Sequence, residues 1–428
     1  MENRKPDRAA PAPDVANPAF EKSGFDINGF DLRAPPADFY DDPYRYYRRL
    51  RDNEPVRVLD DGSVFLTAYD DVAAMYRDPS VSSDKRHEFL PKYGDTSLFE
   101  HHTTSLVFND PPTHPRVRRL ILGAVNQRAI AGMEAVVEAL VDGLLDGLQD
   151  KAQQGRPIDL IEDFAAAIPV EVIGNLLAFP HEDRAPLRGW SLAILAALEP
   201  SLTAQMHVDG NRAVDDFSAY LSELIADRRA HPLDPQEDVL TRLIQGGADG
   251  EALTERQLVH NCIFLLNAGH ETTTNLLGNG MHALMCNRDQ FERLVQAPAL
   301  LQTGIEEMLR YESPLQLNNR RLTEPVRISG RSFDAGTLVT LCIGAANRDP
   351  AQFPDPDRFD VARKPNRHLA FGHGDHACAG MNVARMEARI AVSRLIARFP
   401  AMAPGGEPVR DRRVRFRGFA RLPVILST

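Results

Sequence analysis

The sequence predicts a mainly α-helical protein with small β-sheets and one long central helix. Apolar residues recur at three- and four-residue spacing over much of the region between about residues 130 and 286. The clearest segment begins at Thr254 and stays apolar on more than one face to about Cys286, so it should run through the middle of the molecule. Short strand-like runs bounded by glycine, proline and aspartate lie before and after this helical region.

The N-terminal part divides into an arm and the start of the folded chain. Residues 1–36 are rich in proline, alanine, aspartate and asparagine without an apolar period, which predicts a flexible or surface-wrapping arm. A single domain is expected over 37–428. A helix over Asp42–Arg51 precedes two strand-like runs, Pro55–Leu59 and Ser63–Thr67, and the turn signal Asp-Asp-Gly between them predicts a hairpin.

Helices dominate the middle of the chain. Ile130–Ala152 and Val208–Arg229 both show helical apolar spacing. The long helix has a start signal of its own, because Thr254 and Gln257 match the capping box, in which each side chain bonds the other residue's backbone amide.

The C-terminal part mixes short strands with one more helix. Proline and glycine become frequent after residue 312, and Val326–Ser329 and Thr337–Ile343 are strand-like. A helix is expected over Asn382–Phe399, and Val414–Ser427 resembles a final hairpin.

Composition excludes several classes of protein. The formal net charge of −11 argues against a nucleic-acid partner, because phosphate backbones attract a lysine and arginine excess. Met1–Val15 lacks the apolar stretch of a secretory signal, and no run reaches the roughly 20 apolar residues that span a bilayer. The four cysteines form no C-x-x-C pair, which suits a reducing compartment. We therefore expect a cytoplasmic protein that contacts no membrane.

One cysteine, Cys378, lies in a glycine-rich loop. Phe371–Gly380 reads F-G-H-G-D-H-A-C-A-G and precedes the expected helix. Its glycines permit close backbone approach to a flat cofactor, and amides at the start of the helix would stabilise a thiolate. His373, His376 and Cys378 could also belong to a zinc site, but a second pair of ligands at comparable spacing is missing.

These ten residues match F-G-x-G-x-H/R-x-C-x-G at every specified position and resemble the heme-ligand signature of bacterial soluble cytochromes P-450, which are heme-thiolate monooxygenases. The resemblance extends from about residue 37 to the C-terminus. It implies a single cytochrome P-450 domain, a long helix crossing the heme, and heme b with the Cys378 thiolate as axial iron ligand. It also implies that the loop contacts heme through Phe371, Gly372, His376 and Gly380.

A segment of the long helix, Ala268–Thr273, reads A-G-H-E-T-T and resembles the family's oxygen-activating motif. Small residues there would admit a planar group, and a threonine can bond the carbonyl four residues back or donate elsewhere if the turn opens. The resemblance implies that Ala268 contacts heme, Thr272 hydrogen-bonds the iron-bound oxygen and Glu271 delivers protons through water. Further threonines at 273 and 274 leave the register open by one residue. The alternative is ordinary helix packing with satisfied hydroxyls.

The sequence D-P-P-T-H-P-R-V-R-R at Asp110–Arg119 resembles another family motif. His114 and Arg118 share one helix face, so both can donate to an anionic heme propionate, although in isolation they suit an exposed basic helix. The resemblance adds Arg320 and His376 to this set, with Arg321 as the competitor of Arg320.

Glu307 and Arg310 fit E-x-x-R on a helix from about Pro298 to Tyr311. The other three matches read Glu-Pro-Val-Arg, and proline disfavours a helix at the residue before it. The resemblance implies a structural triad of Glu307, Arg310 and Arg358 that supports the cysteine loop.

The resemblance implies insertion of one oxygen atom from O2 into an organic, largely apolar small molecule, for example by hydroxylation. Electrons would come from NAD(P)H through a reductase and a ferredoxin or flavodoxin, and we expect a monomer. A basic patch of Arg116, Arg119 and Arg385 would receive that partner. The alternatives are a peroxide-driven peroxygenase and a non-enzymatic heme sensor. The expected substrate pocket is lined by Phe89, Phe264, Asn267, Gln316 and Asn318, together with Phe99 and Leu106.

Overall fold

The computed structural model describes residues 29–427 except 126 and 248, and its centre is helix α11 (Glu255–Cys286). Both hydrogen bonds of the predicted capping box are present at 3.2 Å, one from the Gln257 amide to the Thr254 hydroxyl and one from the Thr254 amide to the Gln257 side chain. At the other end, the Asn287 side chain donates to the carbonyl of Ala283. The predicted long helix is therefore confirmed, with its boundaries.

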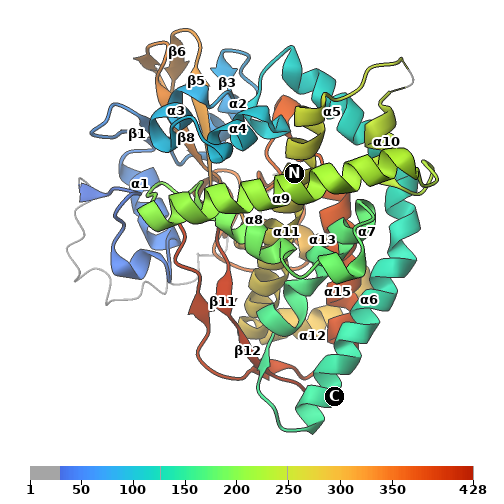
Figure 1. The fold of residues 1–428 in the computed structure, drawn as a ribbon. Coiled ribbons are helices and arrows are strands. Elements are labelled where there is room, and N and C mark those ends of the chain that lie inside the picture. The colour runs from blue at the N-terminus through green and yellow to red at the C-terminus, as the bar shows by residue number, and fades with distance from the viewer. Residues whose placement is uncertain (1–28, 126, 248, 428) are drawn as a thin grey trace, which may run out of the picture.

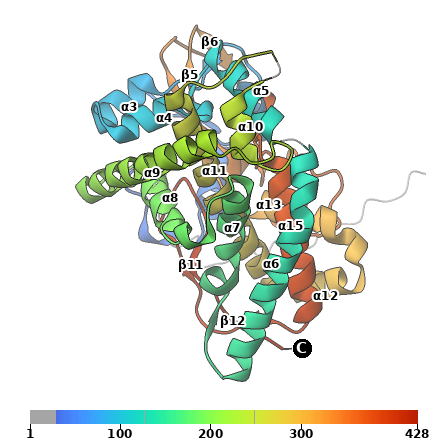
Figure 2. The same ribbon diagram turned by 45° about the vertical axis from the view of Figure 1, so that its right-hand side comes forward.

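Helices surround α11 on several sides. Helix α9 (Ala204–Ala230) crosses in front of it, and α6 (Gln127–Gln153) runs beside α15 (Met381–Arg398) in both views (Figures 1 and 2). The other α-helices are α1 (Tyr44–Asn53), α2 (Tyr69–Met75), α3 (Arg86–Tyr93), α4 (Ser97–Thr104), α5 (Thr113–Ala124), α7 (Ala167–Leu176), α8 (Leu187–Ala196), α10 (Val239–Gln245), α12 (Arg288–Gln296), α13 (Leu301–Tyr311) and α14 (Ile343–Ala346).

The largest sheet lies to one side of the helices, at the upper left of Figure 1, with the order β1-β2-β8-β5-β3. Its strands are β1 (Val56–Val58), β2 (Val64–Leu66), β3 (Val81–Ser82), β5 (Leu317–Leu322) and β8 (Leu338–Cys342). The predicted hairpin is confirmed, because β1 and β2 pair antiparallel and Gly62 takes a φ of 80° in the turn. Strands β6 (Val326–Ile328) and β7 (Arg331–Phe333) form a separate antiparallel pair.

The C-terminal hairpin that the sequence predicts is wrong. Strand β11 (Phe419–Arg421) pairs with β10 (Val409–Arg410), whereas β12 (Pro423–Ile425) pairs with β4 (Ile158–Asp159) and β9 (Ala403–Pro404). A single residue separates β11 from β12, which is too short for the two-residue turn of a tight hairpin. The chain therefore passes from one small sheet directly into the next.

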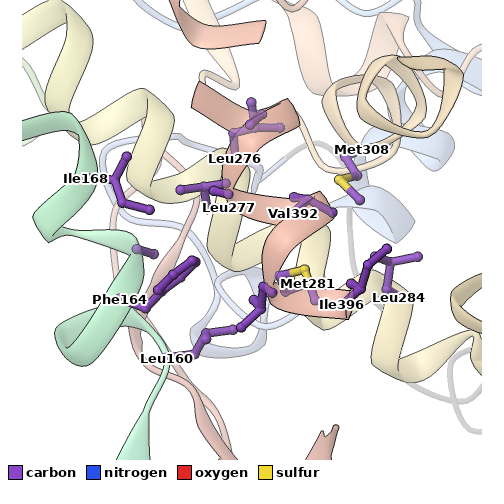
Figure 3. Close-up of a cluster of buried hydrophobic side chains, with 14 of the residues drawn as sticks. Leu160, Phe164, Ile168, Leu276, Leu277, Met281, Leu284, Met308, Val392 and Ile396 are labelled. Carbon is purple, nitrogen blue, oxygen red and sulfur yellow. The ribbon is translucent and has the colours of Figure 1, made fainter. Parts of the chain in front are cut away.

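An apolar cluster fixes the C-terminal half of α11 against its neighbours (Figure 3). Leu277 and Met281 of α11 are buried with Ile168 of α7 and with Val392 and Ile396 of α15. Truncating one such side chain to alanine typically costs about 2–5 kcal/mol. Because α11 and α15 are locked together here, the loop that precedes α15 has a defined position relative to α11.

Most of the predicted N-terminal arm, residues 1–28, lies outside the described residues. From residue 29 onward the chain contacts the body of the protein, since Phe30 and Leu32 are buried in a cluster with Tyr46, Tyr47 and Phe65. Among the described helices, none has the length and apolar character needed to cross a bilayer.

Candidate active site

A cavity of about 320 Å³ lies between α11 and the loop before α15. Cys378 lines it from the loop, and Thr272 lines it from α11. Most of the other lining side chains are apolar. The predicted cofactor contacts His114, Arg118, Ala268, Phe371, Gly372, His376 and Gly380 all border this cavity, whereas Arg320 is not among its lining residues.

The cysteine loop is held by its own backbone. The Cys378 amide donates to the carbonyl of Phe371 at 2.8 Å, while Gly372 and Gly374 take φ values of 65° and 70°. A Cβ on Gly374 would lie 2.4 Å from the carbonyl oxygen of Tyr76, so only glycine fits there. The loop thus presents Cys378 to the cavity immediately before α15.

The thiol of Cys378 needs a positive partner to ionise. Burial raises its pKa, and a backbone hydrogen bond from Gly380 and the charges of Arg118 and Arg385 oppose that shift. A metal ion at the sulfur supplies the missing positive charge and deprotonates a coordinating thiol. The loop therefore suits a thiolate ligand to iron better than a free thiolate.

Four basic side chains gather beside this loop. The rings of His114 and His376 stack with centroids 3.8 Å apart, and Arg118 donates to the carbonyl of Ala377 at 2.8 Å. Burial, followed by the charges of His114, Arg320 and Arg118, lowers the pKa of His376 to about 3. Within the described part of the chain none of the four forms an ion pair with a carboxylate, and Nε2 of buried His114 has no hydrogen-bond partner.

This basic group fits the propionates of the expected heme. Buried donors without an anion carry a desolvation cost that a bound carboxylate relieves. A zinc site does not fit, because the described residues contain no group of three histidine, cysteine or acidic side chains arranged for a metal ion. His373 instead accepts a hydrogen bond from the Gly374 amide at 2.7 Å.

Arg320 and Arg321 of strand β5 are the two candidates for a propionate contact. Their side chains lie on opposite faces of the sheet, because successive side chains alternate along a strand. Arg320 is buried, lies over the Tyr76 ring at 5.3 Å and donates to Asn318. Arg321 pairs with Glu88 at 3.0 Å. The strand therefore directs Arg320 toward His376 and His114, whose pKa values its charge lowers.

The oxygen-activating segment is only partly arranged as expected. The Thr272 hydroxyl lines the cavity and donates to the carbonyl of Ala268 at 2.7 Å, so the helical turn is closed. Thr273 also lines the cavity, so the register stays open. Gly269 borders the cavity too, but a Cβ there would lie 3.1 Å from Ile173, which indicates that its small size also serves helix packing.

Glu271 does not line the cavity. Its buried carboxylate accepts a hydrogen bond from the Asn275 side chain at 3.0 Å and pairs with Arg413 from the C-terminal segment. The acid next to Thr272 is thus held by two partners, neither of which lines the cavity.

The buried ion pair predicted near the loop is present, but its third member is different. Arg310 donates to both oxygens of Glu307 at 2.7 and 2.8 Å, and both side chains are fully buried. Arg363 completes the cluster with its Nε 3.1 Å from the Glu307 carboxylate. The assignment of Arg358 is wrong: its side chain is exposed, and only its backbone carbonyl accepts from Arg310, because the turn at 355–358 points that carbonyl inward.

Some of the residues predicted for the substrate pocket line the cavity. Phe264, Asn267, Asn318 and Leu106 line the cavity. Gln316 is wrong, because it is buried elsewhere and donates to the Tyr44 hydroxyl and the Ser313 carbonyl. Phe99 lines neither cavity, and Phe89 lines a second, adjoining cavity of about 260 Å³.

The predicted basic patch is also wrong for two of its three residues. Arg119 pairs with Asp249 and Glu251, and Arg385 pairs with Glu306 at 2.7 Å. Arg116 donates to Gln257. The ion pairs offset the charges of Arg119 and Arg385 that a docking partner would meet, whereas the neutral amide of Gln257 does not offset the charge of Arg116.

Sequence reasoning missed several cavity residues. His101 and His102 of α4 are buried in the wall, as is Glu387 of α15, whose pKa burial raises to about 8. Arg415 lines the cavity from the C-terminal segment. The arginines between 410 and 417 stand together in the sequence, but no local pattern indicates which of them lines a cavity.

Comparisons with known proteins agree with this geometry. The family model described as Cytochrome P450 matches residues 194–424. The biotin biosynthesis cytochrome P450 of Bacillus subtilis is 35% identical over 393 residues, which cover 91% of this chain and 97% of that protein. Vitamin D(3) 25-hydroxylase of Pseudonocardia autotrophica is 38% identical over 397 residues, covering 91% of this chain and 95% of the relative.

A third relative, the cytochrome P450 monooxygenase PikC of Streptomyces venezuelae, is 38% identical over 403 residues and covers 92% of this chain and 93% of its own. Among solved structures, P450BioI in complex with hexadec-9Z-enoic acid ligated acyl carrier protein superposes with a TM-score of 0.85 at 33% identity. That match covers 91% of this chain and all of the other.

Proposed function

Since this chain belongs to the cytochrome P450 family, we propose that it inserts one oxygen atom of O2 into a largely apolar small molecule in the cavity that Cys378 lines. Members of the family carry heme b with an axial cysteine thiolate, and relatives of named activity are hydroxylases or monooxygenases. The chain is accordingly an oxidoreductase of this kind. The observation that carries the site assignment is that Cys378 and Thr272 line one cavity beside four basic side chains.

Heme, when bound, supplies an iron centre whose thiolate ligand favours O–O cleavage. In this proposal Cys378 is the ligand, and His114, Arg118, Arg320 and His376 donate to the propionates. The small side chain of Ala268 leaves room for the flat cofactor against the surface of α11. Phe371, Gly372 and Gly380 contact it from the loop side.

Thr272 is proposed to hold a cavity water at its Oγ1 and so to place a proton donor beside the position that heme would occupy. Its present bond to the Ala268 carbonyl leaves the oxygen lone pairs free to accept from that water. Glu271 is proposed to relay protons to that water, which requires its carboxylate to leave Arg413 and Asn275 and to take up a proton from solvent before it donates one.

The proposed electron supply is NAD(P)H through a reductase and a ferredoxin or flavodoxin. The neutralised arginines near the loop argue for a weakly charged contact with that partner. A cytoplasmic location and a monomeric state remain predictions from the sequence.

Cys378→Ser tests the assignment directly. The reduced carbonyl adduct of the wild type should show the red-shifted Soret band of thiolate ligation, and the variant should lose it. Cys286→Ser, at an exposed cysteine of α11, is the matched control and should keep it. Survival of the band in Cys378→Ser would overturn the ligand assignment.

Turnover assays then distinguish the proposed monooxygenase from a peroxygenase and from a heme sensor. The proposed monooxygenase should form product with O2, NAD(P)H and a surrogate ferredoxin system. Product formation that is faster with hydrogen peroxide alone than with O2 and the redox system would indicate a peroxygenase, and a stable heme protein that turns over with neither would indicate a sensor.

A further inference from the structure

Two cavities meet at one arginine. The second cavity extends from exposed residues at Asp60 and Asp61 inward, and it shares Phe108, Leu198, Asn318 and Arg415 with the cavity that Cys378 lines. Side chains common to both linings form the partition between them. We call the second cavity the vestibule. A molecule that reached the Cys378 cavity from this vestibule would pass beside the Arg415 guanidinium.

The guanidinium of Arg415 is held firmly but has no counter-ion. It donates to the carbonyls of Leu198 at 3.0 Å and Leu317 at 3.2 Å, and to the side-chain oxygen of Asn319 at 2.5 Å. These contacts use three of its five N–H groups. No carboxylate in the described residues lies within ion-pair distance of it.

Other cations of the vestibule are also poorly compensated. Lys92 donates only to the carbonyl of Glu199, and Lys85 has a buried ammonium without a hydrogen-bond partner, 3.9 Å from Glu88. Burial, and then the charge of Arg415, lowers the pKa of Lys92 to about 8. The cations therefore lie close enough to destabilise one another.

The acids of the vestibule do not cancel this charge. Glu88 is committed to Arg321, and Glu199 accepts the backbone amides of residues 414 and 415 through one oxygen. Burial raises the pKa of Glu199, while backbone hydrogen bonds from residues 415 and 414 and the charge of Arg415, which lies beyond ion-pair distance, oppose that shift. At the rim, Asp31 is paired with Arg33. Among the cations that line this cavity, Arg33, Arg57 and Lys85 each have a carboxylate within ion-pair distance, whereas Arg415 and Lys92 have none among the described residues.

We propose that the substrate is a monocarboxylic acid with an apolar body, and that Arg415 and Lys92 bind its carboxylate at the partition. The acid supplies the counter-ion that both cations lack, and the two unused N–H groups of Arg415 suit a carboxylate. Phe108 and Leu198 flank this point with apolar surface, so the body extends into the Cys378 cavity. This inference rests on the proposed function, because it names the substrate class of the same site.

Binding, measured without turnover, tests the inference. The heme-loaded wild type is titrated with a saturated monocarboxylic acid, its methyl ester and the primary alcohol of equal chain length, over a series of chain lengths. Isothermal calorimetry and the spin-state shift of the heme both report Kd. The acid should bind about 10- to 100-fold more tightly than the ester and the alcohol, as expected for hydrogen bonds to a charged group.

Substitutions test which side chains cause the preference for the acid. Arg415→Gln and Lys92→Met should each remove most of the acid preference while leaving alcohol binding nearly unchanged, and Arg415→Lys should retain part of it. Arg412→Gln, which removes an exposed arginine of the same segment, is the control and should bind like the wild type. Thermal unfolding and the reduced carbonyl spectrum confirm that each variant is folded and loaded.

Equal affinity for acid and ester in the wild type would overturn the proposal, as would an acid preference that survives Arg415→Gln. Absence of the red-shifted Soret band in the reduced carbonyl adduct of the wild type, or absence of O2-dependent turnover, would instead overturn the proposed function. The two failures are distinguishable because calorimetric binding requires neither.

Discussion

The carboxylate of Glu271 is paired with the guanidinium of Arg413, and both side chains are almost completely buried. Glu271 lies within the cavity-lining part of α11, between Gly269 and Thr272, whereas Arg413 belongs to the C-terminal segment 142 positions later. The pair holds the proposed proton relay outside the cavity, although Thr272 at the next position lines it. Proton delivery then requires this contact to open.

Replacing Glu271 with glutamine should slow O2-dependent turnover without weakening heme or substrate binding. Glutamine keeps the hydrogen bond from Asn275 but cannot donate a carboxylic proton, and positioned proton transfer contributes about 10²–10⁴ in rate. Turnover with O2 is compared with turnover on peroxide, which needs no such delivery. An equal loss on both oxidants would argue against a proton relay at Glu271.

Thr272→Ala should keep heme and substrate binding but divert NAD(P)H consumption to peroxide. The variant lacks the hydroxyl that is proposed to hold the proton-delivering water. The measurement is the ratio of product to NAD(P)H consumed. Thr273→Ala is the matched control, since it also lines the cavity. If Thr273→Ala uncouples and Thr272→Ala does not, the register is shifted by one residue.

Arg363→Gln should destabilise the protein, whereas Arg358→Gln should not. Arg363 contacts the fully buried Glu307 carboxylate, and removing one partner of a buried pair costs about 3–5 kcal/mol. Arg358 contributes only its backbone carbonyl, which glutamine retains. Urea unfolding of both variants measures the difference. Similar midpoints would show that Arg310 alone satisfies Glu307.

Loss of the basic group should weaken heme retention. Arg118→Gln and His376→Phe remove donors that face the proposed propionate positions, while Arg321→Gln removes an arginine that is paired with Glu88 instead. Heme transfer to an excess of apomyoglobin measures the rate of loss. We expect faster loss in the first two variants and wild-type behaviour in the third.

Acid should destabilise the protein through buried histidine. Burial lowers the pKa of His270 to about 3, while the unfolded chain retains an ordinary value near 6.5. The unfolded state therefore binds more protons between these values, and stability falls as pH drops from about 6.5 toward 3, by up to about 1.4 kcal/mol per pH unit for this residue.

His270→Gln removes that titration. Its free energy of unfolding should depend less steeply on pH between about 6 and 4 than that of the wild type, measured by urea unfolding at several pH values. Parallel pH curves for the two proteins would place the acid sensitivity elsewhere.

The sequence by itself determined the features that depend on neighbours along the chain. Hydrogen bonds between Thr254 and Gln257 require only three residues of separation, and the apolar period of α11 is a local property. The cysteine loop is largely local, because Gly372 and Gly374 act through their own backbone angles, although the distant Tyr76 carbonyl also excludes a side chain at Gly374. The ion pair of Glu307 and Arg310 follows from their shared helix face.

Only the tertiary structure decided which distant groups meet. Arg363, and not Arg358, forms an ion pair with Glu307. Arg413 forms an ion pair with Glu271. Arg415 lines both cavities. The pairing of β12 with β4 and β9 could likewise not be predicted from the C-terminal residues alone. Each of these contacts joins segments far apart in sequence, and a cationic side chain pairs with whichever anion or carbonyl the packing of helices and loops brings within reach.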